Sequence, residues 1–274
     1  MDNTSIHDKS RDLAHLVDLF LFKGAPGNED PDREIVILVN HGFVVGFCPA
    51  RLQPAWAAYR VAGAGRDLDF DRPHLYYDDT RLDAALRIGP DTFGRMDGVS
   101  YHVGHMVPNE VINRQFGRVA QMETFFMSNM SPQRGSLNTG VWLALENSIR
   151  NIEDTPDRDH VWAMVGPVFG DDPGFLERPN GRRVPVPEAY FCITVDPFRF
   201  PWDRRSNVDI ACLLIPQDTP GGTDLATFLT SVDAIEQATR LKFFPGWSVA
   251  ATELVAPPSG APARDRHRLL RQFS

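Results

Sequence analysis

The sequence predicts an α+β protein in which helices flank a central antiparallel β-sheet. Runs of β-branched residues occur both before and after the middle of the chain, and the clearest helical pattern, residues 136–152, lies between them. Strands grouped in this way, without regular alternation of strand and helix, are typical of α+β proteins. The chain has 274 residues and no internal repeat, so we expect one main domain over residues 31–256.

The first part of the chain predicts a helix, a turn and three strands. Residues 1–30 have leucines at helical spacing, followed by a Gly- and Pro-rich turn. Residues 34–49 contain two β-branched runs joined by a short polar turn around His41, the pattern of a β-hairpin. Residues 53–61 continue as a third strand. Residues 64–100, rich in Asp, Gly, Pro and Arg, predict a long surface connection.

The second part predicts two helices and further strands. In the helix over residues 136–152, Ser136 can cap the first turn, and apolar residues recur at every fourth position. A last helix, residues 233–241, follows Thr230 and Ser231, either of which can cap it. Between the two helices, three apolar runs predict buried strands at residues 161–165, 189–195 and 210–215.

Composition limits the function classes. The formal net charge is −8, so the chain lacks the basic footprint of a tight nucleic-acid binder. Residues 101–150 nevertheless hold four arginines and three acids, a local charge of +1 that leaves −9 for the rest. Three cysteines without paired spacing argue against a disulfide framework or a zinc site. Without a leader or a membrane-length apolar run, we expect a cytoplasmic protein with no membrane segment. The arginine-rich residues 257–274 predict a flexible tail.

Residues 101–150 also hold side chains that suggest chemistry. Asn138, Trp142, Glu146 and Arg150 recur at every fourth position of the predicted helix and therefore form one stripe along it. Taken alone, Glu146 and Arg150 are typical of a surface ion pair worth about 0.3–0.5 kcal/mol. The residues around this stripe favour a functional site instead.

A histidine supplies the group that this stripe lacks. His105 follows Gly104 in a predicted tight turn, where it can be either a packed core residue or a catalytic base. Phosphodiester hydrolysis needs a base that titrates near neutrality, a cation on the phosphate and an arginine for the developing charge. Mg²⁺ prefers oxygen ligands and keeps several waters. Asn138 can therefore be the only direct protein ligand, with Glu146 holding metal-bound waters and with Mn²⁺ as an alternative ion.

In order and spacing, these residues resemble the motif of the DNA/RNA non-specific endonucleases, a family of ββα-metal nucleases that includes endonuclease G. Further likeness runs from roughly residue 35 to residue 255. The matching blocks are His105, Ser128-Asn129 with Pro132-Gln133, Leu137-Asn138 with Trp142, and Leu145-Glu146 with Arg150.

The resemblance implies a ββα-metal active-site motif and a role for each matching residue. His105 would be the general base, Asn138 the magnesium ligand, Glu146 the carboxylate that acts through water, and Arg150 the arginine that stabilises the phosphate. Asn129 matches an asparagine that supports the site, although a buried turn residue is an equal alternative.

The family also uses an arginine upstream of the histidine. Arg72 is the best positional match, and Arg66 and Arg81 lie in the same segment.

The chain departs from the family pattern immediately before Gly104. The motif has Asp-Arg there, whereas this chain has His102 and Val103. The missing arginine removes a cation near the phosphate. The additional imidazole of His102 can support the loop or bind a softer metal.

These residues lead to one main hypothesis and two alternatives. The main hypothesis is a Mg²⁺-dependent endonuclease that hydrolyses DNA, with RNA as a second substrate, without sequence preference. The first alternative, motivated by Val103 and the acidic charge, is a nucleic-acid-binding or regulatory module with impaired chemistry. The second is a nuclease effector held inactive until a partner protein or signal engages it. A homodimer is a further option by analogy with the family.

Overall fold

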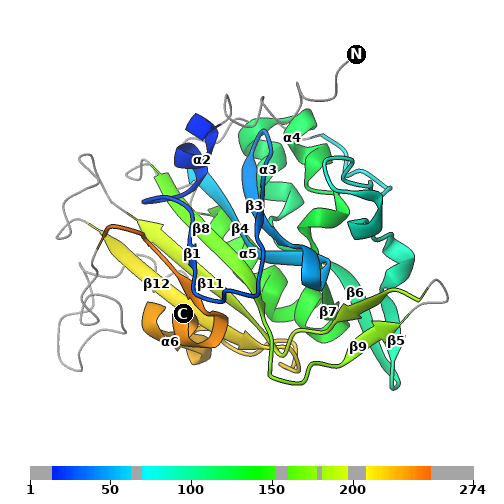
Figure 1. Ribbon diagram of the computed structural model, residues 1–274. Helices are drawn as coiled ribbons and strands as arrows, with labels where there is room; N and C mark the ends of the chain where they lie inside the picture. Colours follow the sequence, from blue (N-terminus) through cyan, green and yellow to red (C-terminus); the bar gives the residue numbers. More distant parts are fainter. Residues whose placement is uncertain (1–13, 63–69, 152–159, 178–180, 197–207, 248–274) are drawn as a thin grey trace, which may run out of the picture.

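A computed structural model of the chain describes residues 14–62, 70–151, 160–177, 181–196 and 208–247. Its main element is a seven-stranded antiparallel sheet in the order β13-β12-β11-β8-β4-β3-β2 (Figure 1). These strands are β2 (Val36–Val39), β3 (Phe43–Cys48), β4 (Gln53–Ala62), β8 (His160–Val168), β11 (Ala189–Asp196), β12 (Asp209–Pro216) and β13 (Leu229–Thr230).

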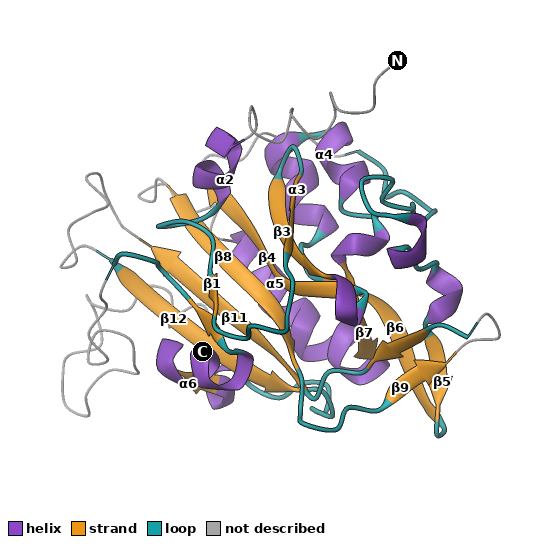
Figure 2. Cartoon of the chain, in the orientation of Figure 1, coloured by secondary structure: helices purple, strands orange, loops and turns teal. Residues whose placement is uncertain are grey.

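Helices cover both faces of this sheet (Figure 2). One face packs against α3 (Asn109–Phe116), α4 (Arg118–Glu123) and α5 (Trp142–Arg150). The other face packs against α2 (Ala14–Phe20), α6 (Val232–Thr239) and β14 (Leu241–Lys242), which pairs with β1 (Gly27–Asn28). The α+β prediction with flanking helices is confirmed.

A smaller sheet, which includes His105, stands beside the main one (Figure 1). It consists of β5 (Gly94–Met96), β6 (Val99–His105) and β7 (Met130–Arg134), all antiparallel. The short hairpin β9 (Phe175–Glu177) and β10 (Arg183–Pro185) contacts it through β5. After β7 the chain forms a π-helix, Leu137–Val141, that leads directly into α5.

Most predicted strands and helices form where the sequence places them. The hairpin around His41 becomes β2 and β3, and Ser231 caps α6 by accepting a hydrogen bond from the Ala234 amide (3.2 Å). Side chains of the predicted N-terminal helix are described from Val17 onward, and the predicted tail lies outside the described residues.

Three local predictions are wrong. Ser136 has helical backbone angles and makes no side-chain cap, because the helical backbone already begins at Gly135. His105 ends strand β6 and is not in a turn, since β6 pairs with β7 up to this residue. The described part of residues 64–100 is also not purely a surface connection, because it forms β5 and buries Leu82 and Phe93.

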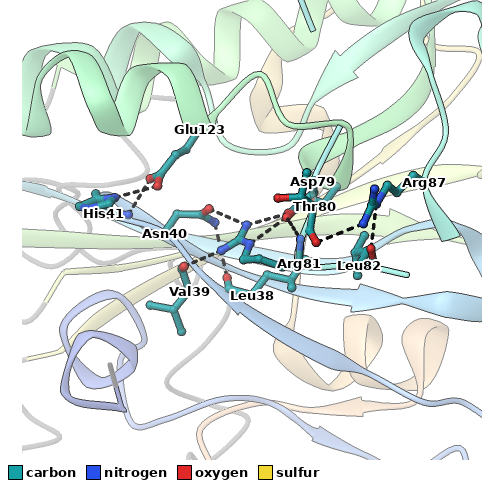
Figure 3. Close-up of polar contacts among 11 residues, drawn as sticks. Leu38, Val39, Asn40, His41, Asp79, Thr80, Arg81, Leu82, Arg87 and Glu123 are labelled. Atoms are coloured by element: carbon teal, nitrogen blue, oxygen red, sulfur yellow. Dashed lines mark hydrogen bonds and ion pairs between the residues drawn. The ribbon is translucent and has the colours of Figure 1, made fainter. Parts of the chain in front are cut away.

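A buried ion pair anchors that segment to the main sheet (Figure 3). Asp79 accepts hydrogen bonds from Arg81 (2.8 and 2.7 Å) and from the Ser128 hydroxyl (2.6 Å). Arg81 also donates to the Val39 carbonyl (2.7 Å) and to the Asn40 side chain (2.9 Å). These bonds lower the pKa of Asp79 against the opposing effect of burial, and they fix the segment before β5.

Candidate active site

The site is built from two antiparallel strands, β6 and β7, which are separated in sequence by α3 and α4, and from the helix that follows β7. In the β6–β7 pair, His102 lies opposite Gln133 and His105 lies opposite Met130. The π-helix after β7 brings Asn138 to the start of α5, and a kink at Gly140, whose backbone angles (φ −108°, ψ −107°) are not helical, interrupts the regular helix between Asn138 and Trp142. The stripe predicted from position 138 onward is therefore broken at its first step.

A cleft of about 720 Å³ opens over these two strands and the helix. Five of the six predicted site residues line it: Arg72, His105, Asn138, Glu146 and Arg150. They come from three separate stretches of the chain. The sequence prediction that these side chains lie together is therefore matched by their placement, while their roles in chemistry stay predictions.

His105 lies in the cleft wall among aromatic rings. Its ring is 4.9 Å from the ring of Phe125 and 6.1 Å from that of Tyr76, measured between centroids. Burial, with a smaller contribution from the Arg72 charge, lowers the pKa of His105 to about 3. The imidazole is therefore neutral at neutral pH, which is the form that accepts a proton. Among the described residues, its buried Nε2 has no hydrogen-bond partner.

Asn129, the sixth predicted residue, lies under the cleft and does not line it. Its side-chain oxygen accepts from the Val107 amide (3.0 Å), and its side-chain nitrogen donates to the carbonyls of Val107 (3.1 Å) and Thr124 (2.9 Å). Its own carbonyl accepts from the Met106 amide (3.0 Å). Asn129 thus fixes the backbone that follows His105, which supports a positioning role.

Gly104, between His102 and His105, is required by a close approach. A Cβ at this position would lie 2.2 Å from the Oε1 atom of Gln133, a buried side chain of β7. Any larger residue would therefore have to displace the buried Gln133 side chain.

Glu146 is half-buried on the side of α5 that faces the cleft. Burial raises the pKa of its carboxyl to about 8, against the opposing effects of the Trp142 indole and the Arg72 charge. The Trp142 Nε1 also donates to the backbone carbonyl of His105 (3.2 Å), so α5 is tied to the end of β6. A nearby cation would favour the ionised carboxylate.

Two arginines provide positive charge in the cleft. The guanidinium of Arg72 lies 5.2 Å from the ring centroid of Phe125, the same ring that contacts His105. Arg150 Nη1 is 3.9 Å from Glu110 Oε1, a weak ion pair at the cleft edge. Of the other candidates, Arg81 is held by the Asp79 contacts of Figure 3, and Arg66 lies outside the described residues.

The side chain of Asn138 lies next to that of His102. Its Nδ2 atom lies 3.3 Å from His102 Nδ1, and both residues line the cleft. Val103, which stands where the family motif has arginine, packs against the apolar cluster that contains Phe93 and Met130. Position 103 therefore supplies no positively charged side chain to the site.

The donor set fits a hard, hydrated cation. Within the described residues, no group of three or more His, Cys, Asp or Glu side chains could hold a metal by itself. The cleft instead offers the amide oxygen of Asn138 and the carboxylate of Glu146, both oxygen donors of the kind that Mg²⁺ takes while keeping waters.

Sequence reasoning missed the aromatic wall of Tyr76 and Phe125 and the carboxylate of Glu110. None of them has a spacing that links it to His105 or Arg150 along the chain. The amphipathic pattern of Asn109–Phe116 could have revealed α3, and with it the position of Glu110.

The paired strands, the following helix and the residues in the cleft define a ββα-metal nuclease module. A protein-family model described as DNA/RNA non-specific endonuclease matches residues 24–250. The chain belongs to the DNA/RNA non-specific endonuclease family, a family of metal-dependent nucleases, and it is a hydrolase that acts on nucleic acids.

Individual relatives agree with this assignment. The nuclease of Serratia marcescens is 26% identical over 214 residues, which cover 77% of this chain and 76% of the relative. Human mitochondrial nuclease EXOG is 25% identical over 220 residues, covering 75% of this chain but only 55% of the relative. Human mitochondrial endonuclease G is 24% identical over 215 residues, with coverages of 74% and 65%.

A solved structure has the same fold. A chain in the crystal structure of the EndoG/EndoGI complex superimposes with a TM-score of 0.67 at 19% identity, covering 87% of this chain and 94% of that chain. None of the described helices is long and apolar enough to cross a membrane.

Proposed function

We propose that this chain is a Mg²⁺-dependent endonuclease that hydrolyses phosphodiester bonds of DNA, and of RNA as a second substrate, with little sequence preference. The observation that best supports this proposal is the joint placement of a neutral imidazole, two arginines, an amide and a carboxyl group in one cleft. These are the groups that phosphodiester hydrolysis requires. Mn²⁺ is the alternative ion.

In this proposal, His105 removes the proton from the attacking water. Because its Nε2 is enclosed, Nδ1 is the nitrogen that takes the proton. The Trp142 indole and the Asn129 clamp keep the backbone on either side of His105 in place.

Arg72 and Arg150 contact the scissile phosphate and stabilise the charge that develops in the transition state. Pairing Arg72 with the phosphate also offsets its charge, which removes the smaller of the two causes that lower the pKa of His105, while burial continues to lower it.

The cation would be held by Asn138 directly and by Glu146 through water, where it supplies Lewis-acid stabilisation of the phosphate and leaving oxygen. Asn138 and Glu146 orient that ion through the start and middle of α5, so the helix sets their separation.

The test is cleavage of supercoiled plasmid and of single-stranded DNA and RNA by purified protein with Mg²⁺, with Mn²⁺ or with EDTA. His105→Ala should lower the rate by at least ~10²-fold. His41→Ala is the matched control, because His41 is exposed, bonds Glu123 and lies outside the cleft lining. Thermal unfolding checks that both variants fold, and equal cutting by His105→Ala and wild type would defeat the assignment.

A second candidate function rests on Val103. An apolar side chain at this position reduces the positive charge that holds the phosphate, so the cleft could bind nucleic acid with impaired chemistry. Salt-dependent binding without metal-stimulated cleavage would favour this binding or regulatory module.

The location, regulation and oligomeric state of the enzyme follow as further expectations. We place the enzyme in the cytoplasm, where an unrestrained nuclease would damage its host, so a regulatory protein partner or signal that holds it inactive fits the proposal. A homodimer is proposed by analogy with the family alone. Size-exclusion chromatography with light scattering tests the oligomeric state.

A further inference from the structure

The replacement of the motif's aspartate by His102 has a structural consequence at the predicted metal ligand. His102 lies on β6, three residues before His105, and its half-buried ring reaches across to the start of the π-helix. Its Nδ1 atom is 3.3 Å from the terminal amide nitrogen of Asn138.

The other edge of the His102 ring is covered by backbone. A Cβ placed on Gly135 would lie 2.9 Å from the ring's Nε2 and 3.1 Å from its Cε1. Glycine at position 135 therefore lets the ring sit against the chain, with Nε2 turned to Gly135 and Nδ1 turned to Asn138.

The separation between the two side chains suits shared ligation of one ion. Ligand atoms bound at about 2.1 Å and at right angles to each other lie about 3 Å apart. Rotation of the Asn138 amide by half a turn exchanges Oδ1 and Nδ2 at nearly the same positions. The oxygen of Asn138 and Nδ1 of His102 would then stand at about this ligand spacing.

We infer that His102 is a second protein ligand of the catalytic cation, through Nδ1, beside Asn138. This inference rests on the proposed function, because it concerns the ion that the proposed reaction uses. It changes the character of the site from all-oxygen to mixed nitrogen and oxygen. Imidazole suits transition metals, whereas Mg²⁺ prefers oxygen, so the site should favour Mn²⁺ over Mg²⁺ more strongly than an all-oxygen site does.

The opposing account is that His102 only orients Asn138 by accepting a hydrogen bond from Nδ2. His102→Asn separates the two accounts, since a short amide can keep a hydrogen bond to Asn138 but offers no imidazole nitrogen. Gly135→Ala is a second variant that keeps the imidazole but displaces its ring through the added Cβ.

The test uses Mn²⁺ alone as the probe, added to the metal-free full-length protein. Electron spin-echo spectroscopy of bound Mn²⁺ detects a directly coordinated imidazole nitrogen, and calorimetry measures the affinity for Mn²⁺ and for Mg²⁺. We expect a nitrogen signal in the wild type that is absent in His102→Asn. Mn²⁺ affinity should fall ~10–100-fold in His102→Asn and by less in Gly135→Ala, with little change in Mg²⁺ affinity.

Every other result counts against the inference. Bound Mn²⁺ with no nitrogen signal, or a signal that survives in His102→Asn, overturns it while leaving the proposed function intact if Mn²⁺ still stimulates cleavage. Absence of both Mn²⁺ binding and metal-stimulated cleavage in the wild type overturns the proposed function as well. Circular dichroism of each variant confirms that the fold is retained.

Discussion

Tyr190 and Phe191 are neighbours on β11, yet they face opposite sides of the seven-stranded sheet. Both sides have an apolar core, and the side of Tyr190, which is also the side of the cleft, adds hydrogen bonds that hold β7. Phe191 lies in an apolar layer and packs edge-to-face against Phe243, with ring centroids 5.5 Å apart. Tyr190 lies on the side of the cleft. Its hydroxyl donates to the Pro132 carbonyl (2.7 Å) and lies 2.8 Å from the Ser131 hydroxyl.

Two glutamines add to the hydrogen bonds on the cleft side. Gln217 also donates to the Pro132 carbonyl (2.8 Å), and the Ser131 hydroxyl donates to Gln53 of β4 (2.7 Å). These bonds dock β7 onto the main sheet. Apolar packing is non-directional, whereas hydrogen bonds fix geometry. Apolar packing therefore stabilises both sides of the sheet, and the hydrogen bonds on the cleft side also fix the position of β7, the strand that pairs with β6 and His105.

The largest expected effect comes from making a cavity in the core on the Phe191 side of the sheet. Phe191→Ala should lower the free energy of unfolding by about 3–5 kcal/mol, because it removes a fully buried ring and leaves a cavity. The kcat per folded molecule should stay within about 2-fold of wild type, since the cleft is on the other face. Denaturant unfolding and cleavage kinetics at low temperature measure both. A tenfold loss of kcat in the folded variant would contradict the division of roles.

Removing one hydroxyl on the cleft side should affect stability less, and activity more, than Phe191→Ala does. Tyr190→Phe leaves the ring against Trp142 but removes the bonds to Ser131 and Pro132, which should cost about 1–2 kcal/mol. We expect kcat to fall several-fold, because β7 is less firmly placed. The same two assays apply, and a kcat loss no greater than that of Phe191→Ala would remove the distinction.

The sequence predicts the strands and helices better than the hydrogen bonds that hold β7 on the main sheet. The strands and α6 follow from β-branched runs and a serine cap, which are local signals. The order of strands in the sheet depends on long-range pairing, such as that of β4 with β8, which no local pattern encodes.

For the site, the motif predicts which residues gather in the cleft but not how their neighbours hold them. Arg72 lines the cleft, whereas Arg81 is held by Asp79 and by hydrogen bonds to Val39 and Asn40. The bonds to Val39 and Asn40 join distant parts of the sequence, so no local pattern separates the two arginines. The contact between His102 and Asn138 depends on the β6–β7 register and on the π-helix. The predicted helix over residues 136–152 forms through Arg150, but the kink at Gly140 and the missing Ser136 cap are not encoded by its apolar spacing.

Two groups in the cleft, His105 and Glu146, should make stability depend on pH in opposite directions. The pKa of His105 is lowered from its ordinary 6.5 to about 3, so its contribution to stability is full above pH 6.5 and is lost as pH falls toward 3. The pKa of Glu146 is raised from 4.5 to about 8, so its contribution is full below pH 4.5 and is lost as pH rises toward 8.

Between pH 5 and 6.5 the two effects offset each other in metal-free protein. The free energy of unfolding should therefore change little in the wild type over this window. Acidification should stabilise His105→Phe and destabilise Glu146→Gln, each by at most about 1.4 kcal/mol per pH unit relative to wild type. Denaturant unfolding in EDTA at several pH values measures this, and parallel curves for all three proteins would show that neither group is shifted.

The smallest expected effect concerns the edge of the cleft. Glu110 lies 3.9 Å from Arg150, and both side chains are partly exposed, so the pair adds less than about 0.5 kcal/mol to stability. Glu110→Gln removes a negative charge beside an arginine that is proposed to contact phosphate. The KM for nucleic acid should fall about 2–3-fold at low salt, with kcat unchanged, and the difference should vanish at high salt because exposed charges are screened. Glu177→Gln is the matched control, since Glu177 pairs with Arg183 (2.7 Å) away from the cleft lining. An equal fall in KM for both variants would mean that net charge alone, and not the position beside Arg150, governs substrate binding.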